Sequence, residues 1–242
     1  MNAVGTVAAI HRYPVKSIGG ESLERAELCW TGIDGDRQYA FLRAGNASRF
    51  PWLTGREVSE LVTWSARYLD ADDPRHSAVR IAADDGEWDV GDAELCARLS
   101  RAAGEEIRLL QVGRGAFDSM PVSVLATVTP RLVAARAGRD MDARRFRANI
   151  LVAVPDGTAV RETDWIGGTL VFGDRPEAAR LRINKAIDRC VMITIDPASA
   201  ARDPAILRHV VEDFDNEIGV YAAVEATGCI VVGDPVRLLT PP

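Results

Sequence analysis

The chain has 242 residues, of which 47% are hydrophobic and 26% are charged, proportions that are ordinary for a soluble globular protein. Its formal net charge is −6, which argues against a nucleic-acid binder that depends on overall positive charge. This length suits one large domain or two smaller domains that share a core.

The first half of the chain is dominated by short apolar runs bounded by turn residues, which predict strands. A helix is expected over 93–103, because Asp92 can cap its start and Gly104 can end it. The predicted strands are 4–13, 22–30, 37–42, 58–68, 79–83, 87–90 and 107–112. Many short strands at this spacing are typical of a β-barrel or a sandwich.

The second half is mixed, and residues 113–119 form the best internal boundary before it. Helices are expected from Pro130, with Thr129 as the capping residue, to about Ala137, and over 204–214. The predicted strands are 122–127, 148–154, 169–172, 181–183, 191–195, 221–225 and 230–238. The whole chain is therefore expected to be mixed and mainly β.

The four cysteines and the lack of targeting signals indicate the cellular setting. The cysteines form no C-x-x-C pair, which argues against an iron–sulfur cluster, a zinc knuckle or a disulfide framework. No run of 18 apolar residues could span a membrane, and the first residues lack the pattern of a signal peptide. We expect a cytoplasmic protein with no membrane or nucleic-acid partner.

One cysteine, Cys190, has a distinctive setting directly after Arg189 and ahead of the Asp196–Pro197 turn. A thiol beside a fixed positive charge is biased toward thiolate, the form that attacks electrophiles and binds soft metals. The other interpretation is that Cys190 is a small buried hydrophobic residue, and the segment alone favours that.

Two segments near the N-terminus could bind an anion. Lys16 and Ser17 lie on a glycine-flanked loop, where a charge and a hydroxyl can bind phosphate together, although a solvated turn is the simpler interpretation. Arg37 begins a strand and could bind an anion with two hydrogen bonds, but the neighbouring Asp36 could equally hold it in an ion pair.

Two segments in the second half add further candidates. Thr127 and Thr129 lie at the start of a predicted helix, whose free N–H groups suit phosphate, although helix capping needs the same residues. Arg147 and Asn149 fall on the same side of a strand start by alternation, and could face a cavity together. Several anion sites and one activated thiol fit a phosphorylated cofactor that carries a soft or transition metal.

These segments, in this order, resemble the MOSC superfamily, named after the C-terminal domain of molybdenum cofactor sulfurase, and most closely the amidoxime-reducing type. The matching segments are Tyr13–Ser17, Asp36–Arg37, Thr127–Thr129, Phe146–Ile150, Arg189–Cys190, Thr194–Pro197 and Gly233–Val236. The resemblance implies a mixed, mainly β (α+β) fold. In it, an N-terminal β-barrel-like domain at 1–112 packs against a MOSC β-barrel domain at 118–242 that has a few short helices.

The same resemblance implies an oxidoreductase that uses the molybdenum cofactor, Mo-molybdopterin, to reduce N-hydroxylated substrates from N–OH to N–H. Its partners would be a small N-oxygenated substrate and a separate electron-donor protein of the ferredoxin, flavoprotein or cytochrome type. Cys190 would be the catalytic residue and the molybdenum ligand. The implied cofactor-binding residues are Lys16, Ser17, Arg37, Thr127, Thr129, Arg147, Asn149, Asp188, Arg189 and Tyr221.

The chain departs from the amidoxime-reducing pattern at Asp188, where relatives more often have serine, and at Ser199–Ala200, where they often have Thr-Gly. Two other functions therefore stay open. The protein could be a molybdenum cofactor carrier or a sulfur-transfer protein in which Cys190 holds a persulfide. It could also be a thiol enzyme without a metal.

Overall fold

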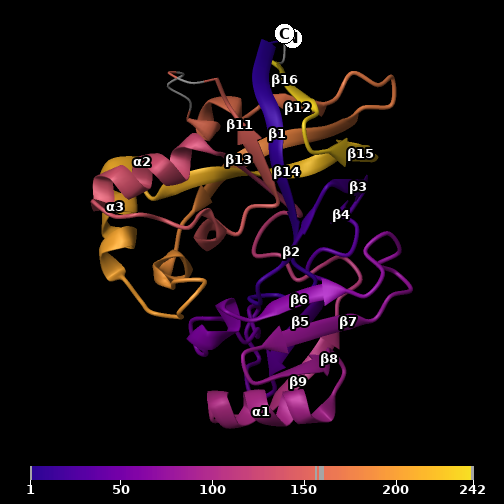
Figure 1. Ribbon diagram of the computed structural model, residues 1–242, viewed down its shortest axis with the longest axis vertical. Helices are drawn as coiled ribbons and strands as arrows, with labels where there is room; N and C mark the ends of the chain where they lie inside the picture. Colours follow the sequence, from indigo (N-terminus) through magenta and orange to yellow (C-terminus); the bar gives the residue numbers. More distant parts are fainter. Residues whose placement is uncertain (1, 156, 158–160, 241–242) are drawn as a thin grey trace.

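The computed structural model describes residues 2–155, 157 and 161–240, and its central feature is a closed barrel of seven strands (Figure 1). The barrel closes because β1, the first strand of the chain, pairs with β11 on one side and β16 on the other. Around the barrel the order is β11 (Ile150–Ala153), β10 (Val122–Ala126), β14 (Glu217–Ala226), β13 (Ala179–Asp188), β12 (Thr169–Phe172), β16 (Pro235–Leu239) and β1 (Asn2–Arg12).

The barrel is filled by alternate side chains of its strands, as the period of two in the sequence predicts. Val7 and Ile10 from β1 meet Val124, Ile150 and Leu170 from the C-terminal half, all at most 1% exposed. The mixed, mainly β fold expected from the sequence is confirmed. Burying this apolar surface is the main stabilisation of the barrel.

The strands that follow β1 are also built into the C-terminal half. β2 (Glu21–Leu23) pairs with β1, and β3 (Arg25–Cys29) pairs with both β4 (Gly32–Ile33) and β15 (Gly228–Val231). The division of the chain at 113–119 stays a prediction, but the first 33 residues share sheets with the C-terminal half.

A second core lies below the barrel in Figure 1 and is made by residues 15–107. Phe41, Leu61, Ile81, Leu95 and Leu99 are all at most 1% exposed there. It is enclosed by the pair β5 (Tyr39–Arg43) and β9 (Ile107–Gln111), the sheet β6 (Ser65–Tyr68), β7 (Val79–Ala83) and β8 (Gly86–Asp89), and the helix α1 (Ala93–Ala103).

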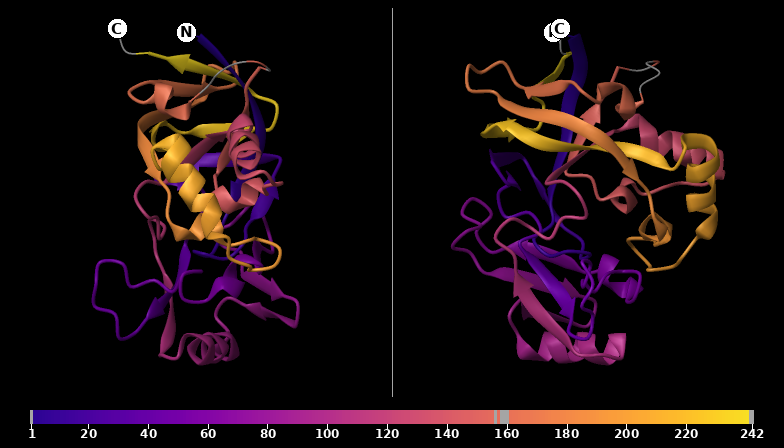
Figure 2. Two further views of the ribbon diagram at one scale, coloured as in Figure 1. Left: turned by 90° about the vertical axis from the view of Figure 1, so that its left-hand side faces the viewer. Right: turned by 180° about the vertical axis from the view of Figure 1, so that it is seen from behind.

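Two helices, α2 (Val128–Ala137) and α3 (Pro204–Phe214), cover one side of the barrel (Figure 2). Leu125 of β10 packs against Val133, Ile206 and Val210 from these helices, so β10 is buried on both of its faces. Apart from Ser123, strand β10 is consequently apolar on both faces instead of alternating, as a strand covered on two sides requires. Among the described residues, no helix is long and apolar enough to cross a membrane.

Four of the predicted strands were wrong. Two contain a 3₁₀ helix, and two divide into separate strands. The runs 58–68 and 191–195 contain the 3₁₀ helices η1 (Ser59–Val62) and η4 (Val191–Thr194), where strands were expected. Each of these turns bonds within itself, as when Ile193 N–H donates to the Cys190 carbonyl at 3.2 Å. Two runs predicted as single strands divide, 22–30 at Glu24 and 230–238 at Gly233, which has a φ of 91°.

Candidate functional site

An open cavity of about 840 Å³ lies between the barrel and the second core. Side chains from both parts of the chain line it, and Cys190 lies among them at the end of β13. Nine of the eleven residues proposed from the sequence are lining residues: Lys16, Ser17, Arg37, Arg147, Asn149, Asp188, Arg189, Cys190 and Tyr221. Folding therefore gathers segments that are far apart in the sequence around one space.

Three lining residues, Ser17, Arg37 and Arg147, have backbones in the left-handed region, with φ of 67°, 50° and 52°. Side chains other than glycine rarely adopt this conformation, because Cβ approaches the backbone closely. Such outliers are concentrated at functional sites, where the surrounding structure maintains the strain. The three strained residues carry the hydroxyl and the two guanidinium groups that the sequence singled out.

Lys16 is 5% exposed and forms an ion pair across the cavity. Its Nζ donates to Asp118 Oδ1 at 2.6 Å and to the Ala116 carbonyl at 2.7 Å. Burial lowers the pKa of Lys16, and the positive charges of Arg37 and Arg147 lower it further. Burial acts to raise the pKa of Asp118, but the charge of Lys16 outweighs this and holds that pKa below its ordinary value.

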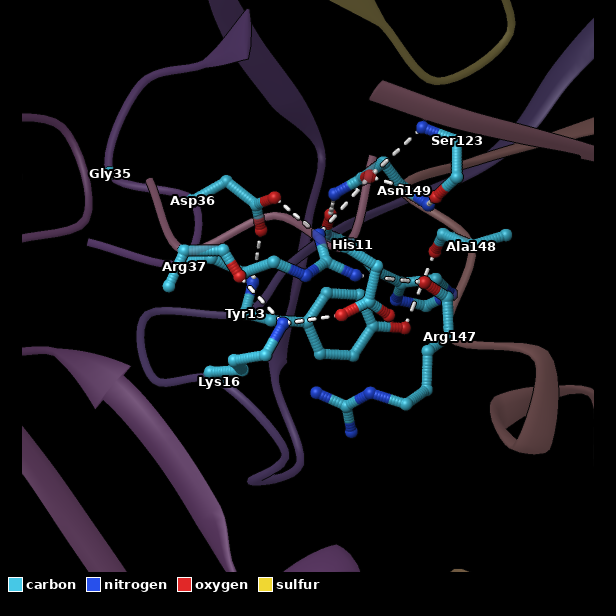
Figure 3. Close-up of polar contacts among 12 residues, drawn as sticks. His11, Tyr13, Lys16, Gly35, Asp36, Arg37, Ser123, Arg147, Ala148 and Asn149 are labelled. Atoms are coloured by element: carbon cyan, nitrogen blue, oxygen red, sulfur yellow. Dashed lines mark hydrogen bonds and ion pairs between the residues drawn. The ribbon is translucent and has the colours of Figure 1, made fainter. Parts of the chain in front are cut away.

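Two arginines flank the ring of Tyr13 (Figure 3). The guanidinium carbons of Arg37 and Arg147 lie 4.8 and 4.5 Å from the ring centroid, as in cation–π contacts. Burial is the main reason that the pKa of Arg147 falls to about 10, and the nearby charge of Arg37 contributes. Both groups still carry a positive charge at pH 7, so they make this wall of the cavity strongly positive.

Asp36 is the carboxylate partner of Arg37 and is 2% exposed. Its carboxylate accepts hydrogen bonds from the Tyr13 backbone N–H at 2.7 Å and from the Arg37 guanidinium. Arg37 also donates to the Arg147 carbonyl at 3.2 Å. The ion pair with Asp36 expected from the sequence is therefore present, and Arg37 also lines the cavity, while its binding of an anion stays a prediction.

Asn149 is 1% exposed, and its side chain connects three segments (Figure 3). The side-chain oxygen accepts from Ser123 N–H at 3.1 Å and from the Ser123 hydroxyl at 2.9 Å, while Nδ2 donates to the His11 carbonyl at 3.2 Å. Asn149 thus holds β1, β10 and the start of β11 together beneath the cavity.

The guanidinium in contact with the Cys190 thiol belongs to Arg56, not to the neighbouring Arg189 expected from the sequence. Arg56 Nη2 lies 3.2 Å from Cys190 Sγ. Arg189 turns inward instead and donates to the carbonyls of Ile218 at 2.8 Å and Phe146 at 2.9 Å, and its buried Nη2 has no partner in the described structure. Burial lowers the pKa of Arg189 to about 10.

A comparison with known families shows which family the chain belongs to. The model of the MOSC domain matches residues 113–237, and that of the MOSC N-terminal beta barrel domain matches residues 4–104. The chain belongs to the MOSC domain family. The family expected from the sequence is therefore confirmed.

One sequence relative and one solved structure are similar to this MOSC protein. Mitochondrial amidoxime reducing component 2 of Bos taurus is 24% identical over an alignment of 298 positions, which covers 98% of this chain and 84% of that protein. The crystal structure of the YuaD protein from Bacillus subtilis superposes with a TM-score of 0.51 at 15% identity, covering 99% of this chain and 97% of that one. At that identity the second likeness concerns the fold alone.

Thr127 and Thr129 are the two proposed residues that are not lining residues of the MOSC cavity. Helix α2 begins at Val128, so Thr129 is inside the helix rather than its cap, and Thr127 makes no capping hydrogen bond through its side chain. The Thr129 hydroxyl donates to Glu162 Oε1 at 2.5 Å, and the same oxygen accepts from Ala126 N–H at 2.8 Å. In this structure Thr129 anchors the helix to a buried carboxylate.

Arg56 was missed from the sequence because its loop falls between predicted elements. Thr54 and Glu57 carry a detectable signal, since a threonine followed three residues later by glutamate is a capping box. Glu57 Oε2 accepts from both the N–H and the hydroxyl of Thr54 at 2.9 Å, which fixes the loop. Arg202 then donates to the carbonyls of Gly55 and Arg56, each at 2.9 Å, and attaches the loop beside Cys190.

Proposed function

We propose that this MOSC protein binds the molybdenum cofactor in the cavity and uses it to reduce N-hydroxylated compounds. The observation that carries the proposal is the pairing of one thiol with a positively charged wall. Cys190 lines the same cavity as Lys16, Arg37 and Arg147. A thiolate suits a soft metal, and clustered cations suit a phosphate, so the two groups match the two ends of a phosphorylated metal–pterin.

The residues present fit such a group in their charge and in their hydrogen-bonding capacity. Lys16, Ser17, Arg37 and Arg147 would hold the phosphate and the pterin, and Cys190 would be the protein ligand of the metal. The Nη2 atom of Arg189 is buried without a partner in the described part of the chain, and the residues Arg189 and Tyr221 are among those that line the cavity. A buried unpaired donor costs about 1–3 kcal/mol, which an acceptor-rich ligand would offset.

When bound, the cofactor would supply a two-electron redox centre. The overall reaction adds two electrons and two protons to an N–OH group, breaks the N–O bond, and releases water with the N–H product. The electrons would come from a separate donor protein, because the sequence has no cysteine motif for an iron–sulfur cluster. The name of the Bos taurus relative, an amidoxime reducing component, supports this class of substrate.

The proposal is tested by measuring metal content after expression in a host that makes the cofactor. Wild-type protein should contain about one molybdenum per chain, as expected for a single thiolate site, and should reduce a benzamidoxime with an artificial electron donor. Cys190→Ala should lose the metal. Cys229→Ala is the matched control, because Cys229 lies outside the cavity, and it should load normally.

Wild-type protein that repeatedly lacks molybdenum and pterin would contradict the proposal. Protein that holds the cofactor, transfers it to an acceptor enzyme and reduces no N-hydroxylated compound would instead be a carrier. A sulfur-transfer protein would show a persulfide at Cys190 by mass spectrometry, with no metal bound.

A further inference from the structure

A second cavity of about 730 Å³ adjoins the first and shares Arg145, Arg147 and Met192 with it as lining residues. None of the functional assignments above uses it. It is bounded on one side by β1 and the Gly19–Gly20 turn, and on the other by η2 (Ala143–Phe146) and the residues that follow η4. The Arg147 side chain thus stands in the wall between the two spaces.

The lining of this second cavity is entirely without acidic residues, although the chain carries a net charge of −6. It contains three arginines, Arg144, Arg145 and Arg147, and one histidine, His11. Arg144 and Arg145 have carboxylate partners in Asp142 and Asp196. No carboxylate of the described chain forms an ion pair with Arg147, which contacts the Tyr13 ring and one carbonyl instead.

Several hydrogen-bond donors around this space are unused. Arg147 donates through Nη2 to the Ile18 carbonyl at 2.8 Å, and Arg144 uses Nε and Nη2 on Asp142. His11 Nδ1 contacts the Ser22 hydroxyl at 3.2 Å. When that hydroxyl donates to Nδ1, the ring proton is on Nε2, which has no hydrogen-bond partner among the described residues. Burial, and then the charge of Arg144, lowers the pKa of His11 and disfavours the charged form of the ring.

We propose that the second cavity is an oxyanion subsite, in which Arg147, Arg144 and His11 bind a phosphate or carboxylate group. The anion would supply the negative charge that Arg147 lacks and the acceptors that these donors lack. It could belong to a separate small molecule or to an extension of the molecule that occupies the first cavity. The inference does not depend on the proposed function, because it concerns the protein with no cofactor bound.

The test uses the full chain without cofactor and follows its histidine resonances by NMR, with inorganic phosphate as the probe. The chain has three histidines, so each ring can be assigned by substitution. At constant pH and ionic strength, the His11 signals should shift saturably with phosphate. His76 and His209, which lie outside the cavity, should not move. Equal shifts of all three rings, or no saturable shift of His11, would overturn the proposal.

Arg144→Gln should weaken phosphate binding at His11 about tenfold, as expected for the loss of one charge-assisted contact. Arg108→Gln is the matched control. Arg108 pairs with a carboxylate two residues away in sequence, as Arg144 does, and both side chains are more than 60% exposed. If Arg144→Gln bound phosphate as tightly as the wild type, Arg144 would not be part of the subsite and the proposal would be wrong.

The two sources of the anion are then distinguished with cofactor-loaded protein. If the His11 signals still respond to phosphate after loading, the subsite takes a group from a separate molecule. If loading itself shifts His11 and abolishes the response, the anion belongs to the cofactor. Both results support the subsite, because it must already have responded in the unloaded chain.

Discussion

At the scale of single residues, Arg147 has a strained backbone, a half-buried side chain and no carboxylate partner in the described structure. A buried cation without a counter-ion is unfavourable, and proteins rarely keep one that serves only packing. The contact with Tyr13 recovers only part of that cost. Stability alone therefore does not account for an arginine at this position, whereas binding of an anionic ligand does.

We expect Arg147→Ala to lower the pterin and molybdenum content at least about tenfold, because one charge-assisted contact contributes about 1.5–3 kcal/mol. The free energy of unfolding should change by less than about 1 kcal/mol, since a buried charge is removed together with its contacts. Metal analysis and urea unfolding measure the two effects. Arg136→Ala, on the exposed side of α2, should change neither. Normal loading of Arg147→Ala would exclude this residue from the site.

At the scale of elements, short segments with their own hydrogen-bond networks hold the cavity walls. One is η3 (Glu162–Trp165), whose buried Glu162 connects to β10 and α2. Another is the turn after Cys190, where Asp196 Oδ1 accepts from the N–H groups of Ala198 and Ser199, both at 3.0 Å. These networks fix backbone positions and do not themselves contact the cavity.

Thr129→Val should lower the free energy of unfolding by about 1–2 kcal/mol, because it removes the hydrogen bond to a buried carboxylate. It should leave the molybdenum content unchanged, because that hydroxyl is directed at Glu162. Chemical denaturation and metal analysis of one preparation test both statements. Loss of the metal from a variant that stays folded would support the cofactor-binding role expected from the sequence.

The Asp196 turn should make part of the stability depend on pH. Burial acts to raise the pKa of Asp196, but hydrogen bonds from Ala198 and Ser199 and the charge of Arg145 outweigh it, so the folded pKa is below its ordinary value of 3.8. A carboxylate with a depressed pKa stabilises the fold above its unfolded pKa, and loses that effect as pH falls through the folded value.

Asp196→Asn should therefore lower the free energy of unfolding by about 1–3 kcal/mol at pH 7, and by progressively less as the pH falls below 3.8. Urea unfolding at a series of pH values measures this. Asp140→Asn, at an exposed position, serves as the control. A deficit that stays constant down to pH 2 would contradict the assignment.

At the scale of the whole molecule, the cavity exists because the barrel and the second core meet, and the N-terminal strand of the chain is part of the barrel. Strand β1 completes the barrel of the C-terminal half, and the chain then continues directly into the Lys16–Ser17 loop at the cavity. Gly55 lies so close to the barrel side that an added Cβ would lie 3.0 Å from Met192 and 3.2 Å from Ile195. The two parts are therefore interdependent.

We expect the fragments 1–112 and 113–242, produced separately, to be poorly folded, since the second lacks β1 and its barrel would stay open between β11 and β16. Produced together, they should associate and regain the circular dichroism spectrum of the intact chain. Full-length protein cleaved at a protease site inserted after the exposed Gly113 is the control and should stay assembled. A stable, cooperatively unfolding fragment 113–242 would contradict this prediction.

Local patterns alone determined much of this protein. Alternating apolar residues specified most strands, and Gly104 ends α1 in the left-handed conformation as expected, whereas Asp92 precedes the helix without a capping hydrogen bond from its side chain. Lys16, Arg37, Arg147 and Cys190 stood out from the sequence through their immediate neighbours and through the family resemblance. Apart from the family resemblance, these signals depend on residues within a few positions of one another, which is the range over which periodicity and capping act.

Only the tertiary structure decided what those residues face. Arg56 reaches Cys190 across 134 positions, Lys16 reaches Ala116 across 100, and Thr129 turns to Glu162 instead of the cavity. Arg189 turns its charge away from the adjacent thiol for the same reason, because backbone carbonyls brought together by folding accept its hydrogen bonds. Side-chain direction and charge partners depend on contacts between distant segments, and no pattern of nearby residues encodes them.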